Sequence, residues 1–506
     1  MQFSHFLVSL SMILMSANYL IEGKYLQKAK FVWKNYTILL FIGLFAIHLI
    51  GLLWSTDTHF GIHDIQIKLP LFALPLAIGS TQKLSAKKFE WVLLFFIATS
   101  LLSSLIGSLI YFFLSAPGDD HRLMSPFLSH IRLSLMIGVA IFACFYLRQR
   151  TIQWSKYKHI FTALCIWFVY YLFILRSMSG LFAFFSAIFI LVWLTSEKQK
   201  SRLTKTIRLV LISFLLLTSG YIYWQINLFY SLDKIDSNTV EKQSKSGENY
   251  EFDFDSKQIE NGHFVQTYIA PNELESTWNQ ISKYPFDSLD LKGHSIKSTI
   301  TRYLTSKNLR KDKEGVLALN EQDIWAIENG IANVRYLNNK SINTLIYRYT
   351  WGIYNFNNGG NPEGNSLAQR FLFWRIGSQI LSQNLLYGVG TGDVQLAFDS
   401  MYTTLPYVIQ KKYQLRAHNQ YLTMGITFGI LGLLYFVWMF FSIFKTHPNS
   451  KSYLFIGTFI ILMTSMLDED TLETQFGITY ALFFFFLFIY HQPLSTEENN
   501  GKQTIT

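Results

Sequence analysis

The sequence predicts an all-helical membrane bundle with one large loop outside the membrane. Half of the 506 residues are hydrophobic and only 15% are charged, a balance typical of polytopic membrane proteins. The apolar residues form runs close to the roughly 20 residues that a spanning helix needs. One long polar stretch, from about residue 227 to 418, separates the last three runs from the earlier ones.

The apolar runs predict about 11 or 12 spanning helices. Pro70 and Pro75 interrupt the third run, which predicts a kink, a re-entrant segment or two half-helices. The expected spans are residues 4–21, 36–54, 66–80, 89–115, 131–148, 158–176, 179–196, 207–226, 419–444, 452–467 and 475–491.

The distribution of Lys and Arg predicts the orientation of the chain. The linkers 22–35, 81–88, 149–157, 197–206 and 445–451 are basic, whereas the linkers 55–65, 116–130, 177–178 and 468–474 are not. Because basic loops stay in the cytoplasm, the N-terminus should lie outside and the C-terminal tail inside. The expected domains are an N-terminal membrane bundle (1–226), a large external loop (227–418), C-terminal membrane helices (419–491) and a cytoplasmic tail (492–506).

The large loop contains two kinds of sequence. Residues 231–261 are polar and predict an exposed or flexible segment, and residues 275–349 carry apolar positions at helical spacing and predict small helices. The net charge of +10 does not indicate nucleic-acid binding, because the basic residues lie mostly in short membrane linkers. Cys144 and Cys165 fall in apolar runs and predict neither a disulfide framework nor a metal site.

Polar residues suited to phosphate chemistry gather between residues 366 and 433, where the loop returns to the membrane. An amphipathic helix carries Arg370, Trp374 and Arg375, and a turn with Gly388, Gly390 and Gly392 follows. Arg416, His418 and Asn419 then precede an apolar run. Arginine forks match phosphate oxygens, and a histidine can take up a proton near neutral pH.

This ordered pattern resembles the O-antigen ligase and O-antigen polymerase superfamily of bacterial envelope glycosyltransferases. The shared features are Arg-x3-Trp, the glycine turn, and His-Asn opening a membrane helix. The resemblance implies the membrane glycosyltransferase C class of fold and an inner-membrane enzyme whose active site faces the periplasm. It also implies a glycan donor linked to undecaprenyl pyrophosphate, with no cofactor.

Five arginines are candidates for the donor pyrophosphate: Arg132, Arg176, Arg370, Arg375 and Arg416. Arg132 and Arg176 lie at expected outer helix ends, where arginines often only extend to the membrane surface. Both resemble superfamily motifs, although Arg176 departs from the commoner Ser-Arg-Gly order. Arg370 and Arg375 are about 140° apart around a helix, so one of them should pair with a carboxylate, and we favour Arg370 for phosphate.

His418 is the candidate general base. A lone histidine is usually structural, but its unperturbed pKa of about 6.5 suits proton abstraction from a sugar hydroxyl, and the resemblance places the functional histidine here. Trp374, Asn419 and the glycine turn are candidate supporting residues. The turn should end the Arg370 helix and allow close backbone approach, while its N–H groups remain available to an anion.

Four carboxylates, Asp468, Glu469, Asp470 and Glu473, lie before the last apolar run. We interpret them as a solvated cap or as partners of nearby arginines rather than as metal ligands, because no His/Cys/carboxylate spacing indicates a metal.

The residues predict an inverting, metal-independent transfer to an acceptor hydroxyl. A ligase acting on lipid A-core is favoured, with a polymerase that extends a glycan or a protein O-oligosaccharyltransferase as alternatives. A transporter of lipid-linked sugar would need charged residues in mid-membrane and paired broken helices, of which only one is apparent. A structural envelope protein would not need His418.

Overall fold

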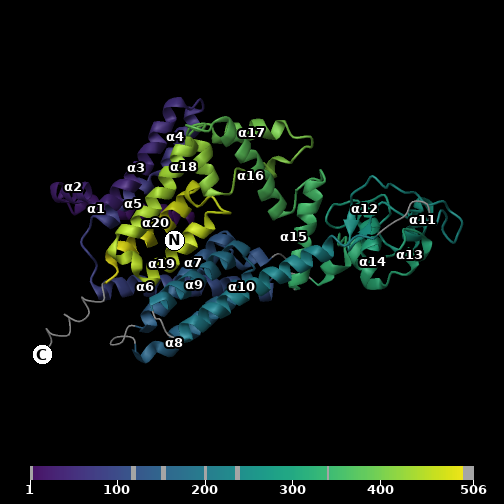
Figure 1. Cartoon of the computed structure of the whole chain (residues 1–506), viewed down its shortest axis with the longest axis horizontal. Coiled ribbons are helices and arrows are strands. Elements are labelled where there is room, and N and C mark those ends of the chain that lie inside the picture. Colours follow the sequence, from purple (N-terminus) through teal and green to yellow (C-terminus); the bar gives the residue numbers. More distant parts are fainter. Residues whose placement is uncertain are drawn as a thin grey trace. The chain divides into compact units, whose positions relative to one another are not determined.

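The computed structural model describes residues 4–114, 121–149, 155–198, 202–233, 240–338 and 341–493. Most of the expected cytoplasmic tail therefore lies outside the described residues. The chain divides into two compact units (Figure 1). The membrane unit comprises Met1–Arg208 and Arg370–Thr506, and the insert unit comprises Leu209–Gln369.

The described structure is mainly helical with almost no strand, which confirms the predicted fold class. The helices are α1 His5–Ile21, α2 Tyr25–Lys34, α3 Tyr36–Ile50, α4 Thr58–Lys68, α5 Pro70–Gly79, α6 Ala86–Leu109, α7 His130–Gln149, α8 Lys158–Leu175, α9 Met178–Lys198, α10 Arg202–Phe229, α11 Pro271–Ile281, α12 Ile296–Ser306, α13 Lys313–Leu317, α14 Glu321–Glu328, α15 Ile342–Asn357, α16 Ser366–Gln383, α17 Val394–Thr403, α18 Gln420–Thr446, α19 Tyr453–Ser465 and α20 Gln475–Phe486. Two short strands, β1 Ile259–Glu260 and β2 His263–Phe264, pair antiparallel.

Eight described helices are long and apolar enough to cross a membrane. They are Tyr36–Trp54, Thr58–Gly79, Ala86–Leu114, His130–Gln149, Lys158–Leu175, Met178–Thr195, Arg202–Phe229 and Gln420–Thr446. The first apolar run forms one helix, Phe6–Ile21, and a bend of 112° separates it from a second helix, Tyr25–Lys34, which lies in the predicted linker 22–35. The last two runs form shorter helices, Tyr453–Ser465 and Gln475–His491. Each of the predicted spans thus contains a helix, although length and composition support fewer crossings than predicted.

The third span begins earlier than the sequence indicated. Residues 58–65 belong to α4 rather than to a linker, because the Asp57 side chain accepts a hydrogen bond from the N–H of Phe60 and caps the helix. The expected interruption falls at Leu69, after which Pro70 starts α5. Proline is tolerated there because the first N–H groups of a helix have no partner within it.

A second broken helix was not predicted. Gly429 has φ +67° inside α18, so the regular hydrogen-bond ladder stops there. The freed carbonyls of Ile426 and Thr427 accept from the N–H groups of Val389 and Gly390, both at 2.9 Å. A Cβ at Gly429 would lie 2.2 Å from the Leu386 carbonyl oxygen, so this close approach requires glycine.

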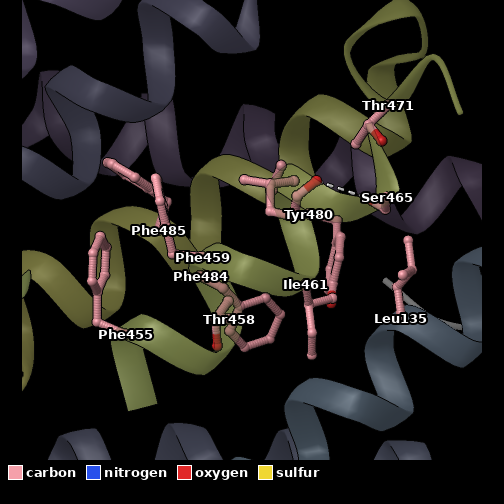
Figure 2. Close-up of a pocket in the computed structure, with 12 residues that line it drawn as sticks. Leu135, Phe455, Thr458, Phe459, Ile461, Ser465, Thr471, Tyr480, Phe484 and Phe485 are labelled. Atoms are coloured by element: carbon pink, nitrogen blue, oxygen red, sulfur yellow. Dashed lines mark hydrogen bonds between the residues drawn. The ribbon is translucent and has the colours of Figure 1, made fainter. Parts of the chain in front are cut away.

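Aromatic side chains fill the core of the membrane unit. The Phe41 ring of α3 lies 5.9 Å from Phe440 of α18 and 5.3 Å from Phe485 of α20. Figure 2 shows an apolar pocket lined mainly by α19 and α20, with Leu135 beside them. Its volume of about 10 Å³ corresponds to about one water molecule, so it cannot hold a substrate.

The insert unit has its own core. Trp278 of α11 and Tyr303 of α12 are fully buried there, and α13 and α14 complete the cluster. The predicted small helices are therefore present. The polar segment before them is not simply flexible, since Glu251 forms a β-bridge with Ile269. Contacts group α17 and nearly all of α16 with the membrane unit rather than with the rest of the predicted 227–418 loop.

Candidate active site

The four carboxylates predicted to form a solvated cap lie in a largely buried loop between α19 and α20. We call residues 468–473 the acidic loop. Glu473 is 7% exposed, and the other three carboxylates are half-buried. Cations and hydrogen-bond donors from α4, α16 and the segment before α18 converge on this loop. The alternative prediction, that the carboxylates serve as arginine partners, agrees with this geometry.

Arg370 of α16 binds one end of the acidic loop. Its Nε donates to the Asp468 carbonyl at 3.2 Å, and its Nη2 contacts Glu469 Oε1 at 3.1 Å. Among the described residues, none accepts a hydrogen bond from its Nη1. Arg375, about a third of a turn away from Arg370 in projection, is exposed and acts electrostatically on Tyr407. Arg370 therefore pairs with a carboxylate of the acidic loop.

Asp470 holds the backbone of His418. The N–H groups of His418 and Asn419 donate to the two carboxylate oxygens, each at 2.9 Å, and the Thr423 hydroxyl donates at 2.8 Å. His418 has φ +45°, a left-handed conformation that non-glycine residues adopt uncommonly. The Asn419 side chain caps α18 by accepting from the N–H of Leu422. The clamp and the cap together determine where the imidazole lies.

The His418 ring lies between an aromatic ring and a carboxylate. Its centroid is 5.8 Å from that of Phe373, and Nδ1 lies 4.0 Å from Glu469 Oε2, too far for a hydrogen bond. Burial, followed by the charges of Arg370 and Arg416, lowers the pKa of His418 to about 4. The ring is therefore neutral near pH 7, as a proton acceptor must be.

The pKa of Glu469 is raised, whereas that of His418 is lowered. Burial raises the pKa of Glu469 to about 7, although the Arg370 charge partly offsets the effect. Near neutral pH this carboxyl is therefore divided between its charged and neutral forms. Its charge decides how strongly Arg370 is held by the protein.

A buried charge network anchors Arg416. The sequence motifs did not predict this network. Arg416 lies 3.7 Å from Glu473, which also contacts Lys68 at 2.8 Å. Lys68 contacts Asp64 at 2.7 Å, and Gln420 donates to Glu473 at 3.0 Å. Burial alone would raise the pKa of Glu473, but Lys68 and Arg416 hold it below its usual value. The available signal was an Asp-x3-Lys pair within an otherwise apolar segment, since such charges are rarely left unpaired.

Of the remaining boundary arginines, Arg132 lies on α7 and Arg176 directly follows α8. Arg132 donates to the Thr474 hydroxyl at 3.0 Å, directly after the acidic loop. The Ser179 hydroxyl of α9 hydrogen-bonds Asp468. Arg176 is exposed at the corner between α8 and α9, with φ +51°. The structure thus brings Arg132, Arg370, Arg416 and His418 to one loop, and it places Arg176 three residues before a serine that contacts the same loop.

The glycine turn is a packing feature rather than an anion cradle. The N–H of Gly388 donates to Asn384, those of residues 389 and 390 to α18, that of Thr391 to Gly51, and that of Gly392 to the Ser55 hydroxyl. The expectation that these N–H groups remain available to an anion is therefore wrong, because each already has an internal acceptor.

The Trp374 indole nitrogen is buried without a hydrogen-bond partner among the described residues.

Within the described part of the chain, no three His, Cys, Asp or Glu side chains are grouped as metal ligands. That transfer needs no divalent metal stays a prediction.

Comparison with known proteins supports the resemblance drawn from the motifs. The family model described as O-antigen ligase matches residues 330–437, which include Arg370, the glycine turn and His418. No curated protein matches the chain. The family match supports a glycosyltransferase or ligase type of enzyme that acts on glycan-linked lipids in general. It agrees with the apolar helices of a multi-pass membrane protein.

Proposed function

We propose that this protein is an O-antigen-ligase-like glycosyltransferase of the bacterial inner membrane. It transfers a glycan from undecaprenyl pyrophosphate to an acceptor hydroxyl at the periplasmic face. Lipid A-core is the favoured acceptor. The observation that carries this proposal is the convergence of Arg370, Arg416 and His418 on the acidic loop within a bundle of apolar helices.

The arginines would bind and stabilise the leaving group. Arg370 keeps Nη1 without a protein acceptor among the described residues, and Arg132 is engaged by one hydroxyl and the Phe476 ring. Planar guanidinium groups match pyrophosphate oxygens, and the charge on the pyrophosphate grows as its bond to the sugar breaks. Arg176 and Arg375 are proposed as outer contacts to the same donor.

His418 would accept the proton of the acceptor hydroxyl. Nδ1 is buried, which leaves Nε2 as the nitrogen that a hydroxyl can approach. The acceptor oxygen bonds to the anomeric carbon as the bond to pyrophosphate breaks, so one displacement inverts that carbon. The proton moves to His418, and ionised Glu469 stabilises the resulting imidazolium. Bound pyrophosphate offsets the two arginine charges, so it should raise the pKa of His418 toward its usual value.

The acceptor distinguishes three versions of this activity. A ligase uses lipid A-core, a polymerase uses a second glycan, and a protein O-oligosaccharyltransferase uses Ser or Thr. The same base and arginines serve all three, because each acceptor supplies a hydroxyl. Purified protein given lipid-linked glycan and each acceptor in turn should yield one dominant product, identified by mass spectrometry.

His418→Ala tests the proposal. A positioned base contributes about 10²–10⁴-fold to the rate, so turnover should fall by that order while donor binding persists. His294→Ala is the matched control. Like His418, His294 has a carboxylate near its Nδ1, that of Asp290 at 3.5 Å, but His294 belongs to the insert unit. Wild-type transfer by the His418 variant would contradict the assignment. Loss of donor binding together with turnover would make His418 a pyrophosphate ligand instead.

Transport of lipid-linked sugar is the second candidate, favoured by the unexpected break in α18 and by charged residues within the third span. The carbonyls freed at the break are, however, occupied by the glycine turn and line no pathway. Proteoliposomes should show transfer without net translocation of the lipid-linked glycan. Translocation that continues in His418→Ala would favour the transporter.

A further inference from the structure

The insert unit contains a groove that the proposed transfer site does not use. It lies between α12, α15 and the chain leading into β1, and its volume is about 480 Å³. Ligand sites commonly occupy about 300–1,000 Å³. Its polar wall includes Gln258, Ser298, Asn355 and Asn358, and its aromatic wall includes Trp351 and Tyr354. We call it the insert groove.

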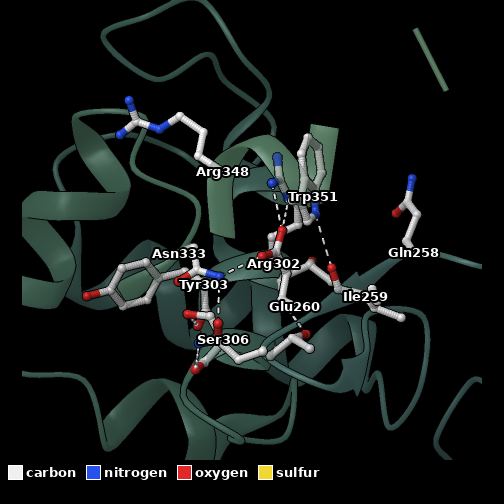
Figure 3. Close-up of polar contacts among 12 residues, drawn as sticks. Gln258, Ile259, Glu260, Arg302, Tyr303, Ser306, Asn333, Arg348 and Trp351 are labelled. Atoms are coloured by element: carbon white, nitrogen blue, oxygen red, sulfur yellow. Dashed lines mark hydrogen bonds and ion pairs between the residues drawn. The ribbon is translucent and has the colours of Figure 1, made fainter. Parts of the chain in front are cut away.

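A buried ion pair makes the base of the insert groove rigid. Glu260 is fully buried, and its Oε1 contacts Arg302 Nη2 at 2.6 Å and Nε at 2.7 Å. Its Oε2 accepts from Asn333 at 2.6 Å and from the Tyr347 hydroxyl at 3.0 Å, as Figure 3 shows in part. A charge that is so completely hydrogen-bonded keeps its geometry, because losing any partner leaves it unpaired in the interior.

The same ion pair positions the aromatic wall. The Arg302 guanidinium lies 4.4 Å from the centre of the Trp351 ring, and the Trp351 indole N–H donates to the Ile259 carbonyl at 3.1 Å (Figure 3). The indole is thus held on one face and at its nitrogen. Arg302 also lines the groove, and among the described residues none accepts a hydrogen bond from its Nη1.

The chemistry of this lining selects a class of ligand. Amides and hydroxyls form hydrogen bonds to hydroxyl groups in both directions, and aromatic rings pack against the apolar C–H faces of sugar rings. Glu260 neutralises Arg302 at the base, and Lys257 adds one further positive charge to the lining. A nucleotide or pyrophosphate would need several cations without such compensation. The combination favours sugar residues over these phosphates.

We propose that the insert groove is a glycan-binding site that holds a short saccharide segment of the lipid-linked donor. The identification of that segment as a transfer substrate rests on the proposed function, whereas saccharide binding rests on the groove alone. Asn355, in the last turn of α15, and Asn358, at its C-cap, are the specificity-determining residues, because they line the groove beside the aromatic wall.

Saturation-transfer NMR on the full chain in lipid nanodiscs tests the proposal without maltoside detergent, whose sugar would compete. The probes are oligosaccharides released by mild acid from the lipid-linked glycans of the source cells. Asn358→Ala should weaken binding roughly three- to tenfold, the value of one or two hydrogen bonds. Asn329→Ala is the matched control. Asn358 and Asn329 each follow the end of a helix, and each side chain donates to the carbonyl four residues earlier, at 2.9 Å and 2.8 Å respectively. Asn329, however, is not among the residues that line the groove.

A second variant tests the aromatic wall. Trp351→Ala removes one of its two rings and should strongly weaken the sugar signals. Its thermal transition, compared with that of wild type, shows whether the variant is folded. Absent sugar signals in wild type, or signals unchanged in both folded variants, would overturn the inference. His418→Ala should retain saccharide binding and lose transfer. Binding by a wild-type protein that transfers nothing would contradict the proposed function and leave the groove assignment standing.

Discussion

Asp470→Asn should slow glycan transfer strongly without weakening donor binding. In the wild type one carboxylate oxygen holds the His418 N–H, while the other holds Asn419 and Thr423. An amide can keep the second pair of bonds, but its NH₂ group then faces the His418 N–H. One charge-assisted hydrogen bond, worth about 1.5–3 kcal/mol, is lost where a left-handed histidine needs it. At about 1.4 kcal/mol per tenfold, kcat should fall roughly 10- to 100-fold.

The control is Asp393→Asn, because Asp393 forms the same kind of clamp elsewhere. It accepts from the N–H groups of Thr56 and Asp57 and from the Thr56 hydroxyl, at 2.8–3.0 Å. Both variants should lose thermal stability to a similar extent, but only Asp470→Asn should lose turnover with the donor KM retained. Equal loss of kcat in the two variants would refute the reasoning, because it would make the Asp470 clamp merely structural.

The pH dependence gives a second readout of the same clamp. Burial raises the pKa of Asp470 to about 6, with the charge of Glu473 adding to the effect. The carboxyl therefore becomes neutral as pH falls through 6, which weakens its bonds to the backbone of His418. Wild-type kcat should decline across that range, and Asp470→Asn should lack this limb. An identical pH profile for kcat in the variant would contradict the assignment.

Four further predictions concern the donor, the metal and the topology. Arg370→Lys and Arg176→Lys keep the charge but lose the planar fork, so both should insert normally and lose much of the transfer activity; wild-type rates would leave these arginines as membrane anchors. Because the pKa of Glu469 is raised to about 7, acidification from pH 8 to 6 neutralises it, frees Arg370 and should lower the donor KM. Glu469→Gln should remove that dependence, and a donor KM that still varies with pH in this variant would exclude Glu469 as its cause. Transfer should survive EDTA, and loss restored by magnesium or manganese would indicate a metal site. Cysteine at Ser246 should react with an impermeant maleimide in cells whose outer membrane alone is permeabilised, and labelling only after inner-membrane lysis would reverse the topology.

Local sequence was sufficient for the helices and for the list of chemically capable residues. Each apolar run contains a helix, and eight described helices are long and apolar enough to cross a membrane, since burying about 20 apolar residues in lipid depends on composition more than on neighbours. The break in α18 was not predictable in the same way. Gly429 takes its positive φ because residues 385–390 dock there, and that contact joins segments about forty residues apart.

Composition and motifs predict a helical membrane protein with Arg370 and His418 as candidate functional groups. The protonation and pairing of these two groups follow from the folded structure. Arg370 pairs with Glu469, and the same burial that raises the pKa of that carboxyl lowers the pKa of His418. Lys68 contacts the acidic loop through Glu473, which lies about four hundred residues later in the chain. The physical reason is that charge interactions depend on distance and burial in the folded chain, which local sequence patterns do not contain.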